Sequence, residues 1–116
     1  MSSNDKPLVW LTDLVKTPPM GTEARREAGY LLRLLQAGES LGPAEGSKPL
    51  PSIGSGIHEL KIKDGEKNAT WRIVYRIDSD AIIVAGWFNK KSQKLPKNFV
   101  ETCQQRLRRY DDLIQE

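Results

Sequence analysis

The chain reads TWRIVYRID from Thr70 to Asp78, and this stretch decides the fold. Every second residue in it is large and apolar, so these side chains share one face of an extended chain: Trp71, Ile73, Tyr75 and Ile77. The positions between them carry Arg72, Val74 and Arg76. Such period-two alternation predicts a β-strand that has one face in the core.

Two more strands flank this one in the sequence. In residues 57–63, one face carries His58, Leu60 and Ile62, and the other carries Glu59, Lys61 and Lys63. Residues 81–88 are almost wholly apolar, which indicates a strand that is covered on both faces. Only short turns, at Asp64-Gly65 and at residues 78–80, separate the three strands. Consecutive strands joined in this way predict an antiparallel meander.

A strand and a helix are expected before the meander. Residues 8–11 are a short apolar run, which we interpret as a first strand. Apolar residues at helical spacing then predict a helix: Ala24, Ala28, Leu31 and Leu35. We expect Thr22 to cap the N-terminus of this helix and Gly38 to end it. Gly29 lies inside the helix, and close packing is the only reason that we can give for it.

A second helix is expected after the meander, opened by Pro96 in its first turn. Its apolar stripe is Val100, Cys103, Leu107, Tyr110 and Ile114. Residues 38–56 contain five glycines and three prolines, and we expect no regular element there. The expected order is β-α-loop-β-β-β-α, an α+β fold with a small, twisted, mainly antiparallel sheet packed on helices. We expect a single domain over residues 1–116, in which residues 1–6 form a disordered tail.

The composition excludes several classes of protein. One cysteine rules out an intrachain disulfide, and one histidine with one cysteine does not suffice for a zinc site with ordinary ligands. A nuclease that needs two histidines is excluded by the same count. The polar N-terminus shows no signal peptide, and the longest apolar run is far too short to span a bilayer. We therefore expect a cytoplasmic protein with no membrane association, no metal and no cofactor.

The distribution of charge is more informative than the net charge of +3. Between residues 57 and 97, the chain has nine Lys and Arg residues but five Asp and Glu residues. The cations on the expected strands and just beyond them are Lys61, Lys63, Arg72, Arg76, Lys90, Lys91 and Lys94. If the strands are adjacent, these cations converge on one side of the sheet. There they would hold a polyanion and stabilise negative charge that develops on a phosphate.

Two interpretations of these cations stay open. Each lysine can simply belong to the solvated face of a sheet. Arg72 lies among apolar residues, and a buried cation needs a partner or a function. An ion pair with Glu59 would satisfy Arg72 without any catalysis.

Several segments together resemble one family of toxins. Residues 71–77 are similar to the aromatic-Arg-hydrophobic-Val-Tyr strand of RelE/HigB-type toxins. FNKKSQKLP, residues 88–96, resembles the F-x-K-K-S/T-x-K-x-P segment of their HigB-like, phage Gp49-like branch. HELKI, residues 58–62, is similar to the E-L-R/K strand of that branch, and residues 23–35 resemble its helix. The resemblance covers nearly the whole chain from Pro7 to Tyr110.

The resemblance implies a RelE/ParE-like fold, an activity and a partner. These toxins of type II toxin–antitoxin systems typically bind the ribosomal A site and cleave messenger RNA there without a metal. The 2′-hydroxyl of the messenger attacks the adjacent phosphate, and the 5′-oxygen leaves. The partner is normally a cognate antitoxin, in this branch often a helix-turn-helix protein. We therefore expect a ribosome-dependent endoribonuclease, that is, an mRNA interferase.

The resemblance also implies roles for individual residues. Arg72 corresponds to the strand arginine that contacts the scissile phosphate. Lys91, with Lys90, stabilises the transition state or protonates the leaving oxygen. Lys61 and Lys63 match strand cations that act as a base or bind the RNA backbone. Further expected RNA contacts are Lys94, Arg76 and Trp87, for which stacking on a base and a core position are the two alternatives.

One departure from the family pattern keeps two other functions open. Many members of the branch have a histidine two residues before the Phe of the basic segment, where this chain has Gly86. The general acid and base are therefore not assigned. One rival function is a ParE-like toxin that inhibits DNA gyrase, against which Arg72 and the Lys90-Lys91 pair argue. The other is a catalytically degenerate module of phage origin that only binds RNA or an antitoxin.

We expect His58 and Cys103 in the core, His58 with a hydrogen bond.

Overall fold

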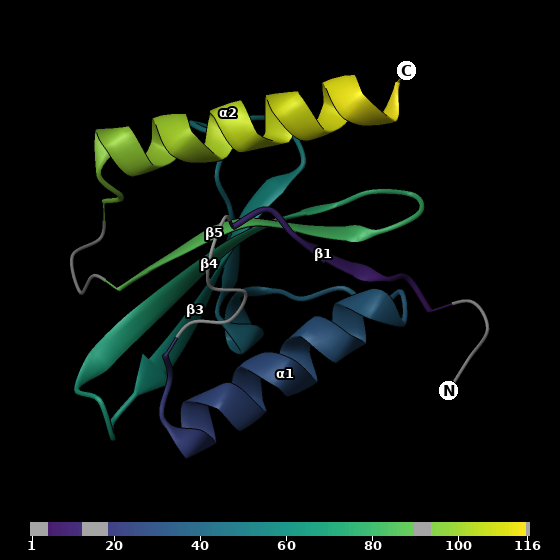
Figure 1. Cartoon of the computed structure of the whole chain (residues 1–116). Coiled ribbons are helices and arrows are strands. Elements are labelled where there is room, and N and C mark those ends of the chain that lie inside the picture. The colour runs from purple at the N-terminus through teal and green to yellow at the C-terminus, as the bar shows by residue number, and fades with distance from the viewer. Residues whose placement is uncertain (1–4, 13–18, 90–93, 116) are drawn as a thin grey trace.

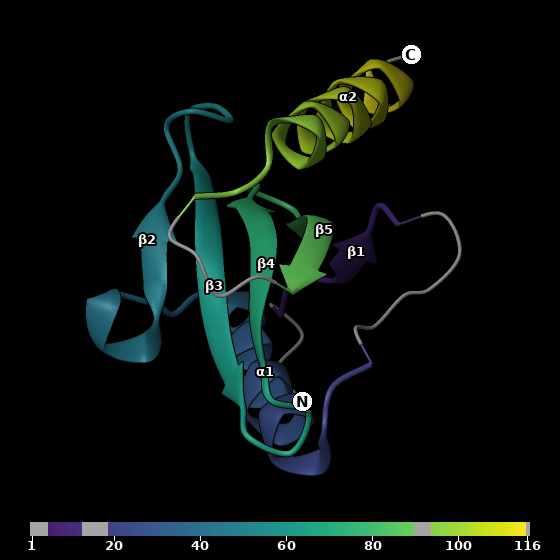
Figure 2. The ribbon, with the colours of Figure 1, turned by 90° about the vertical axis from the view of Figure 1, so that its left-hand side faces the viewer.

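Strand β4, Ala69–Ile77, is the middle strand of a five-stranded sheet, as the alternation of its residues predicts. The computed structural model describes residues 5–12, 19–89 and 94–115. The order of the strands across the sheet is β1-β5-β4-β3-β2, and Figure 2 shows them side by side in this order. The expected α+β fold with a mainly antiparallel sheet is thus confirmed.

The three strands predicted around residue 72 form an antiparallel meander. β3, Ile57–Asp64, and β5, Ile82–Asn89, both pair antiparallel with β4. β1, Leu8–Trp10, lies on the other side of β5 and runs parallel to it. A parallel neighbour needs a long connection, and here the connection includes every element from the first helix to β4.

The two helices cover opposite faces of the sheet (Figure 1). They are α1, Thr22–Gln36, and α2, Lys97–Ile114. The core between α1 and the sheet contains Leu35 and Ile73, and the core between α2 and the sheet contains Cys103 and Val74. Because successive side chains of a strand point to opposite faces, β4 contributes to both cores. Neither helix is long and apolar enough to cross a membrane.

A β-bulge in β5 changes which of its side chains share a face. The extra residue is Ala85, which lies between the pairs Val74–Gly86 and Tyr75–Val84. Beyond the bulge the alternation of faces is inverted, so Trp87 packs against the core beneath α1. A regular strand would have placed Trp87 on the face that α2 covers.

The expectation that residues 38–56 form no regular element is wrong. This segment contains a 3₁₀ helix, Pro43–Glu45, and the edge strand β2, Ser47–Pro49, which pairs antiparallel with β3. Gly46 joins the two elements with a φ of +86°, and a Cβ there would lie 2.8 Å from the carbonyl oxygen of Lys61. An edge strand also tolerates a proline, because one of its sides has no partner. The glycines and prolines therefore shape a short strand rather than preclude one.

The ends of α1 fall close to the positions that the sequence predicts. Gly21, rather than Thr22, is the N-cap, and its N–H donates to Asp64 Oδ2 at 2.8 Å. Gly38 follows the end of the helix in the left-handed conformation, with a φ of +92°, as expected. The expectation that Gly29 packs closely is wrong, since no heavy atom lies within 4 Å of the place that its Cβ would take.

Lys6 is held in place, although the sequence predicts a disordered tail over residues 1–6. Its backbone N–H donates to the carbonyl of Gln36 at 2.8 Å, and its Nζ donates to the carbonyl of Asp78, also at 2.8 Å. The side-chain amide of Gln36 in turn donates to the carbonyl of Lys6. These bonds attach Lys6, the last residue of the expected tail, to the fold, and residues 1–4 lie outside the described residues.

Candidate functional site

Arg72 forms a buried ion pair with Glu59. The Nη1 atom of Arg72 donates to Glu59 Oε1 at 2.8 Å, and the two side chains are 1% and 2% exposed. The other carboxylate oxygen, Oε2, is also buried and accepts no hydrogen bond from the described part of the chain. The ion pair that the sequence left as one of two interpretations is therefore present.

The register of β3 and β4 explains why these two residues meet. Lys61 lies directly opposite Arg72, and Glu59 lies opposite Val74, so Glu59 is the diagonal neighbour of Arg72 on one face. Like charges that lie directly opposite destabilise a sheet, and the diagonal carboxylate offsets one of them. The charges of the buried Arg72 and Glu59 thus cancel, and the positive charge of Lys61 remains.

Lysines surround the buried pair where the sheet is open to solvent. Lys61 is half-buried, and Lys63, on the same face of β3, is exposed. A hollow of about 490 Å³ at the start of α2 is lined by Glu59, Lys94 and Lys97. A second hollow of about 260 Å³, beside β2 and β3, is lined by Glu59 and Lys61. Glu59 therefore lies between two hollows that both carry lysines, and this surface attracts a polyanion.

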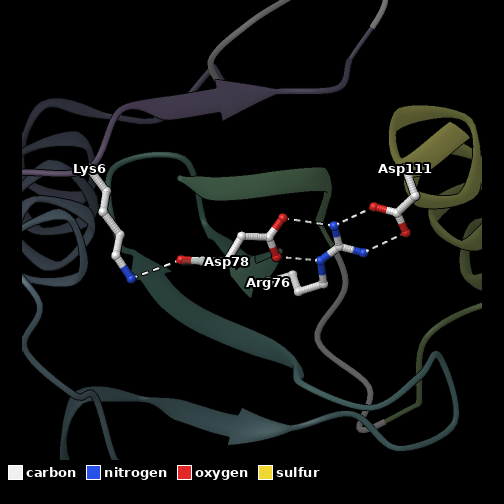
Figure 3. A network of polar contacts seen from close by, with 4 residues as sticks. All are labelled: Lys6, Arg76, Asp78 and Asp111. Carbon is white, nitrogen blue, oxygen red and sulfur yellow. Dashed lines mark hydrogen bonds and ion pairs between the residues drawn. The ribbon is translucent and has the colours of Figure 1, made fainter. Parts of the chain in front are cut away.

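Arg76 belongs to a different network, which Figure 3 shows. Its Nε and Nη2 donate to the carboxylate of Asp78 at 2.7 and 2.9 Å. Its Nη1 and Nη2 donate to the carboxylate of Asp111 at 3.1 and 2.7 Å. The hydrogen bonds to Asp78 and Asp111 raise the pKa of Arg76, and the bond from Arg76 lowers the pKa of Asp111. Two carboxylates thus occupy this guanidinium, which ties α2 to β4.

Trp87 does not reach the face that carries the lysines. Its ring lies edge-on to Trp71 with centroids 5.7 Å apart, and its Nε1 is buried without a hydrogen-bond partner among the described residues. The aromatic residue that β5 contributes to the face of the lysines is Phe88, which lies opposite Arg72 in the register of β4 and β5. Phe88 packs against Phe99 of α2, with centroids 5.2 Å apart. Because of the bulge, Phe88 rather than Trp87 lies at this surface.

Side chains of α2 fill the space beside Gly86. A Cβ at this position would lie 2.9 Å from Arg106 Nη1, 3.2 Å from Phe99 Cε1 and 3.4 Å from Cys103 Sγ. Arg106 Nη1 donates to the carbonyl of Ala85 at 2.9 Å. Arg106 therefore takes the space that a histidine at position 86 would need.

Of the two residues expected in the core, Cys103 lies there and His58 lies only at its edge. Cys103 is fully buried, and this burial raises the pKa of its thiol to about 12. His58 is half-buried and stacks on Tyr75, with centroids 5.4 Å apart. Its Nδ1 has no hydrogen-bond partner among the described residues, so the hydrogen bond expected of a core histidine is absent at this atom.

The structure thus brings together only part of the predicted site. The predicted residues that lie around the Arg72–Glu59 pair are Lys61, Lys63 and Lys94. Arg76 and Trp87 lie elsewhere, and Lys90 and Lys91 fall outside the described residues. The sequence reasoning did not single out Lys97 and Phe88 as site residues. The position of Lys97 at the predicted start of the second helix could have indicated it as a site residue. Phe88 can be recognised as one only when the bulge in β5 is known.

No metal site is formed by the residues that the structure describes: they contain no group of three or more His, Cys, Asp or Glu side chains that could hold an ion.

One family model, described as phage derived protein Gp49-like, matches residues 14–108 of the chain. No curated protein and no solved structure matches it.

Proposed function

Because the chain belongs to the phage-derived Gp49-like family, which lies within the RelE/HigB-like toxin superfamily, we propose that it cleaves messenger RNA on the ribosome. The family is associated with the toxins of toxin–antitoxin systems. The observation that supports a nucleic-acid substrate is the ring of lysines around the Arg72–Glu59 pair: Lys61, Lys63, Lys94 and Lys97. Such a surface suits the repeated negative charges of an RNA backbone.

The proposed reaction is a transesterification within the RNA. The 2′-oxygen forms a bond to the adjacent phosphorus, and the bond from phosphorus to the 5′-oxygen breaks. The 2′-hydroxyl loses its proton, and the leaving 5′-oxygen gains one. Negative charge grows on the phosphate in the transition state, where nearby cations stabilise it. The chemistry needs cations, which lysine and arginine side chains supply, and proton transfer, for which a lysine donates a proton when charged and accepts one when neutral.

In this proposal Arg72, Lys91 and Lys90 form the catalytic set. Lys61 and Lys63 bind the RNA backbone along β3, and Lys94 with Lys97 binds it at the start of α2. Phe88 replaces Trp87 as the aromatic side chain beside the RNA. Arg76 is left out, because Asp78 and Asp111 already occupy its guanidinium.

Arg72 contacts a phosphate in this reaction only after its surroundings move, since its side chain is 1% exposed. Arginine has five N–H donors, so Arg72 can keep Glu59 and still donate to a phosphate. Glu59 then holds the guanidinium in one orientation while the phosphate binds. The carboxylate also limits the net charge of the empty site.

The proposed partner is a cognate antitoxin, encoded beside the toxin as a small helix-turn-helix protein. The toxin acts in the cytoplasm, where ribosomes and messenger RNA are found. Binding of the antitoxin suppresses cleavage until the antitoxin is lost.

The test is inducible expression in a bacterium, followed by primer extension on an abundant messenger. We expect cuts within translated codons for the wild type and none for Arg72→Ala or Lys91→Ala. Lys61→Ala and Lys94→Ala reduce cutting without disturbing the core, because both residues lie at the surface of the site. Arg108→Ala is the matched control, since Arg108 is an exposed cation of α2 outside the site. It should cut like the wild type.

The burial of Arg72 supports a second candidate, a degenerate module that binds RNA or an antitoxin without cleavage. Intact messengers and normal growth on induction would favour this module. Intact messengers with arrested growth would instead point to a ParE-like action on DNA gyrase. Either result would contradict the proposed cleavage of messenger RNA.

A further inference from the structure

The face of α1 that borders β1 carries an apolar groove that the proposed reaction does not use. The groove has a volume of about 270 Å³ and lies between α1 and the edge strand β1. Its walls include Leu8 and Trp10 of β1 and Leu32 of α1, with Ile73 of β4 in its lining. The helices α1 and α2 cover opposite faces of the sheet (Figure 1). The groove beside α1 and the lysines on the face of α2 therefore lie on different sides of the molecule.

Gly29 is the feature of this groove that the fold leaves unexplained. It lies in the middle of α1, where a glycine is unfavourable by about 1 kcal/mol relative to alanine. It adopts no left-handed conformation, and no heavy atom lies within 4 Å of the position of a Cβ. Nothing within the described chain therefore requires a glycine. A side chain at this position would project beside the groove, so its absence leaves room for a binding partner.

Positive charges flank this gap along the helix. Arg25 precedes Gly29 by about one turn and Arg33 follows it by about one turn, so the three residues form one line on α1. Both arginines are exposed and line the groove. The acidic residues of the helix, Glu23 and Glu27, are not part of the groove lining. The groove thus has an apolar floor and a rim of two arginines.

We propose that this groove is the docking site of the antitoxin. The antitoxin segment would place an apolar side chain over Gly29 and carboxylates against Arg25 and Arg33. The apolar floor favours a protein over RNA, because RNA offers no aliphatic side chain to fill it. The paired arginines favour carboxylates, which a guanidinium binds through two parallel hydrogen bonds. This inference rests on the proposed function, since an antitoxin presupposes a toxin.

The test measures binding of the purified chain to the antitoxin encoded beside it, by isothermal titration calorimetry. Gly29→Met fills the gap, and Arg25→Glu with Arg33→Glu reverses the charge of the rim. We expect each change to weaken binding by about tenfold or more, which corresponds to about 1.4 kcal/mol. Gly29→Met should fold at least as well as the wild type, because methionine favours a helix more than glycine does.

Two matched controls lie on the same helix but outside the groove lining. They are Glu27→Met, which adds the same side chain, and Arg26→Glu, which reverses one charge. Both should bind the antitoxin within about twofold of the wild type. Wild-type affinity in both groove variants would overturn the inference. Weaker ribosome binding in the arginine variant, with unchanged antitoxin binding, would also overturn it and assign the groove to RNA.

Primer extension and growth on induction are measured in parallel. A chain that cuts messengers while its groove variants bind the antitoxin normally refutes the docking site alone. A chain that leaves messengers intact, while Gly29→Met loses antitoxin binding, refutes the nuclease and upholds the docking site. The two failures are thereby distinguished.

Discussion

Asp64 is the residue that joins the first helix to the turn between β3 and β4. Its Oδ2 accepts hydrogen bonds from the backbone N–H of Gly21 at 2.8 Å and from Trp71 Nε1 at 3.0 Å. Its Oδ1 accepts one from the N–H of Lys67 at 3.2 Å. The bond from Gly21, followed by those from Trp71 and Lys67, lowers the pKa of Asp64 below its ordinary value of 3.8. The charged form is thus the one that the fold holds.

The low pKa of Asp64 predicts a dependence of stability on pH. A carboxyl whose pKa is lower in the folded state stabilises the fold above the unfolded pKa, and the effect is lost as the pH falls through the folded pKa. Asp64→Asn should therefore unfold at a lower urea concentration than the wild type at pH 6, and this difference should shrink below about pH 4. Asp112→Asn, exposed on α2, is the control and should leave the midpoint unchanged. A difference that stays constant down to pH 3 would contradict the assignment.

The Arg72–Glu59 pair allows a test by paired substitution. Removing one partner of a buried ion pair leaves an uncompensated charge, so Glu59→Gln should lower the free energy of unfolding by about 3–5 kcal/mol. Glu59→Leu with Arg72→Met should lose much less, because well-packed apolar residues can replace such a pair. Urea unfolding measures both. Glu23→Gln breaks the exposed pair with Arg26 and should cost less than about 1 kcal/mol. A loss in the double variant that equals the sum of the losses in Glu59→Leu and Arg72→Met alone would show that the two side chains are not coupled.

At the scale of elements, replacement by alanine should change the stability of the fold in opposite directions at two glycines. Gly46 has a φ of +86°, and a Cβ at this position would lie 2.8 Å from the carbonyl oxygen of Lys61 in β3. Gly46→Ala should therefore destabilise the fold by about 2 kcal/mol or more, from left-handed strain and the close contact. Gly29→Ala fills open space in α1 and should stabilise it by up to about 1 kcal/mol. Thermal unfolding compares the two, and a stabilised Gly46→Ala variant would refute the packing of β2 on β3.

The attachment of α2 to the sheet gives a second prediction at this scale. Asp111→Asn should weaken the bonds from Arg76 and cost about 0.5–1 kcal/mol, since Arg76 and Asp111 are 17% and 39% exposed and partly screened by solvent. Hydrogen exchange should then become faster in the second half of α2, with α1 unchanged. Glu101→Gln, an exposed change in the same helix, is the control. Faster exchange throughout the sheet would instead indicate a global loss of stability.

Period-two alternation was enough to predict β3 and β4, because the two faces of a half-buried strand differ in polarity, and the apolar run at residues 81–88 was enough to predict β5. The edge strand β2 escaped prediction because it is only three residues long, and its proline and the glycine before it resemble those of a loop. The sequence left two positions open for Trp87, the RNA surface and the core, and Trp87 packs against the core. A bulge inverts the alternation, and pairing with a neighbouring strand decides where a bulge forms. The sequence thus placed the cations on strands but did not show which aromatic residue joins them.

At the scale of the whole molecule, the candidate site depends on pairs that are distant in sequence. The sequence indicated Arg72 and named Glu59 as a possible partner, which the register of β3 and β4 brings together. The separation of Arg76 from the site could not be foreseen, because Asp111 comes from α2 and reaches Arg76 only in the folded chain. The role of Lys90 and Lys91 stays a prediction.

The single cysteine reports on unfolding of the whole molecule. Cys103 is fully buried between α2 and the sheet, and its thiol pKa is about 12. At pH 8 the thiol is therefore protonated and covered, and a thiol-reactive dye should modify it only through opening of the fold. The fraction modified by a short pulse of dye should follow the urea unfolding curve recorded by circular dichroism. Rapid modification without urea would show that α2 opens on its own.

The pairing of β1 with β5 has a consequence for the synthesis of the protein. A ribosome releases the N-terminus first, so β1 leaves the exit tunnel long before Ile82, the residue that pairs with Leu8. Pairings between residues so far apart in sequence form late. The helix that closes the second core, α2, is translated after all five strands of the sheet. A messenger that is broken before codon 82 therefore directs a product with an unpaired first strand, and one that is broken between β5 and α2 directs a product with an open second core.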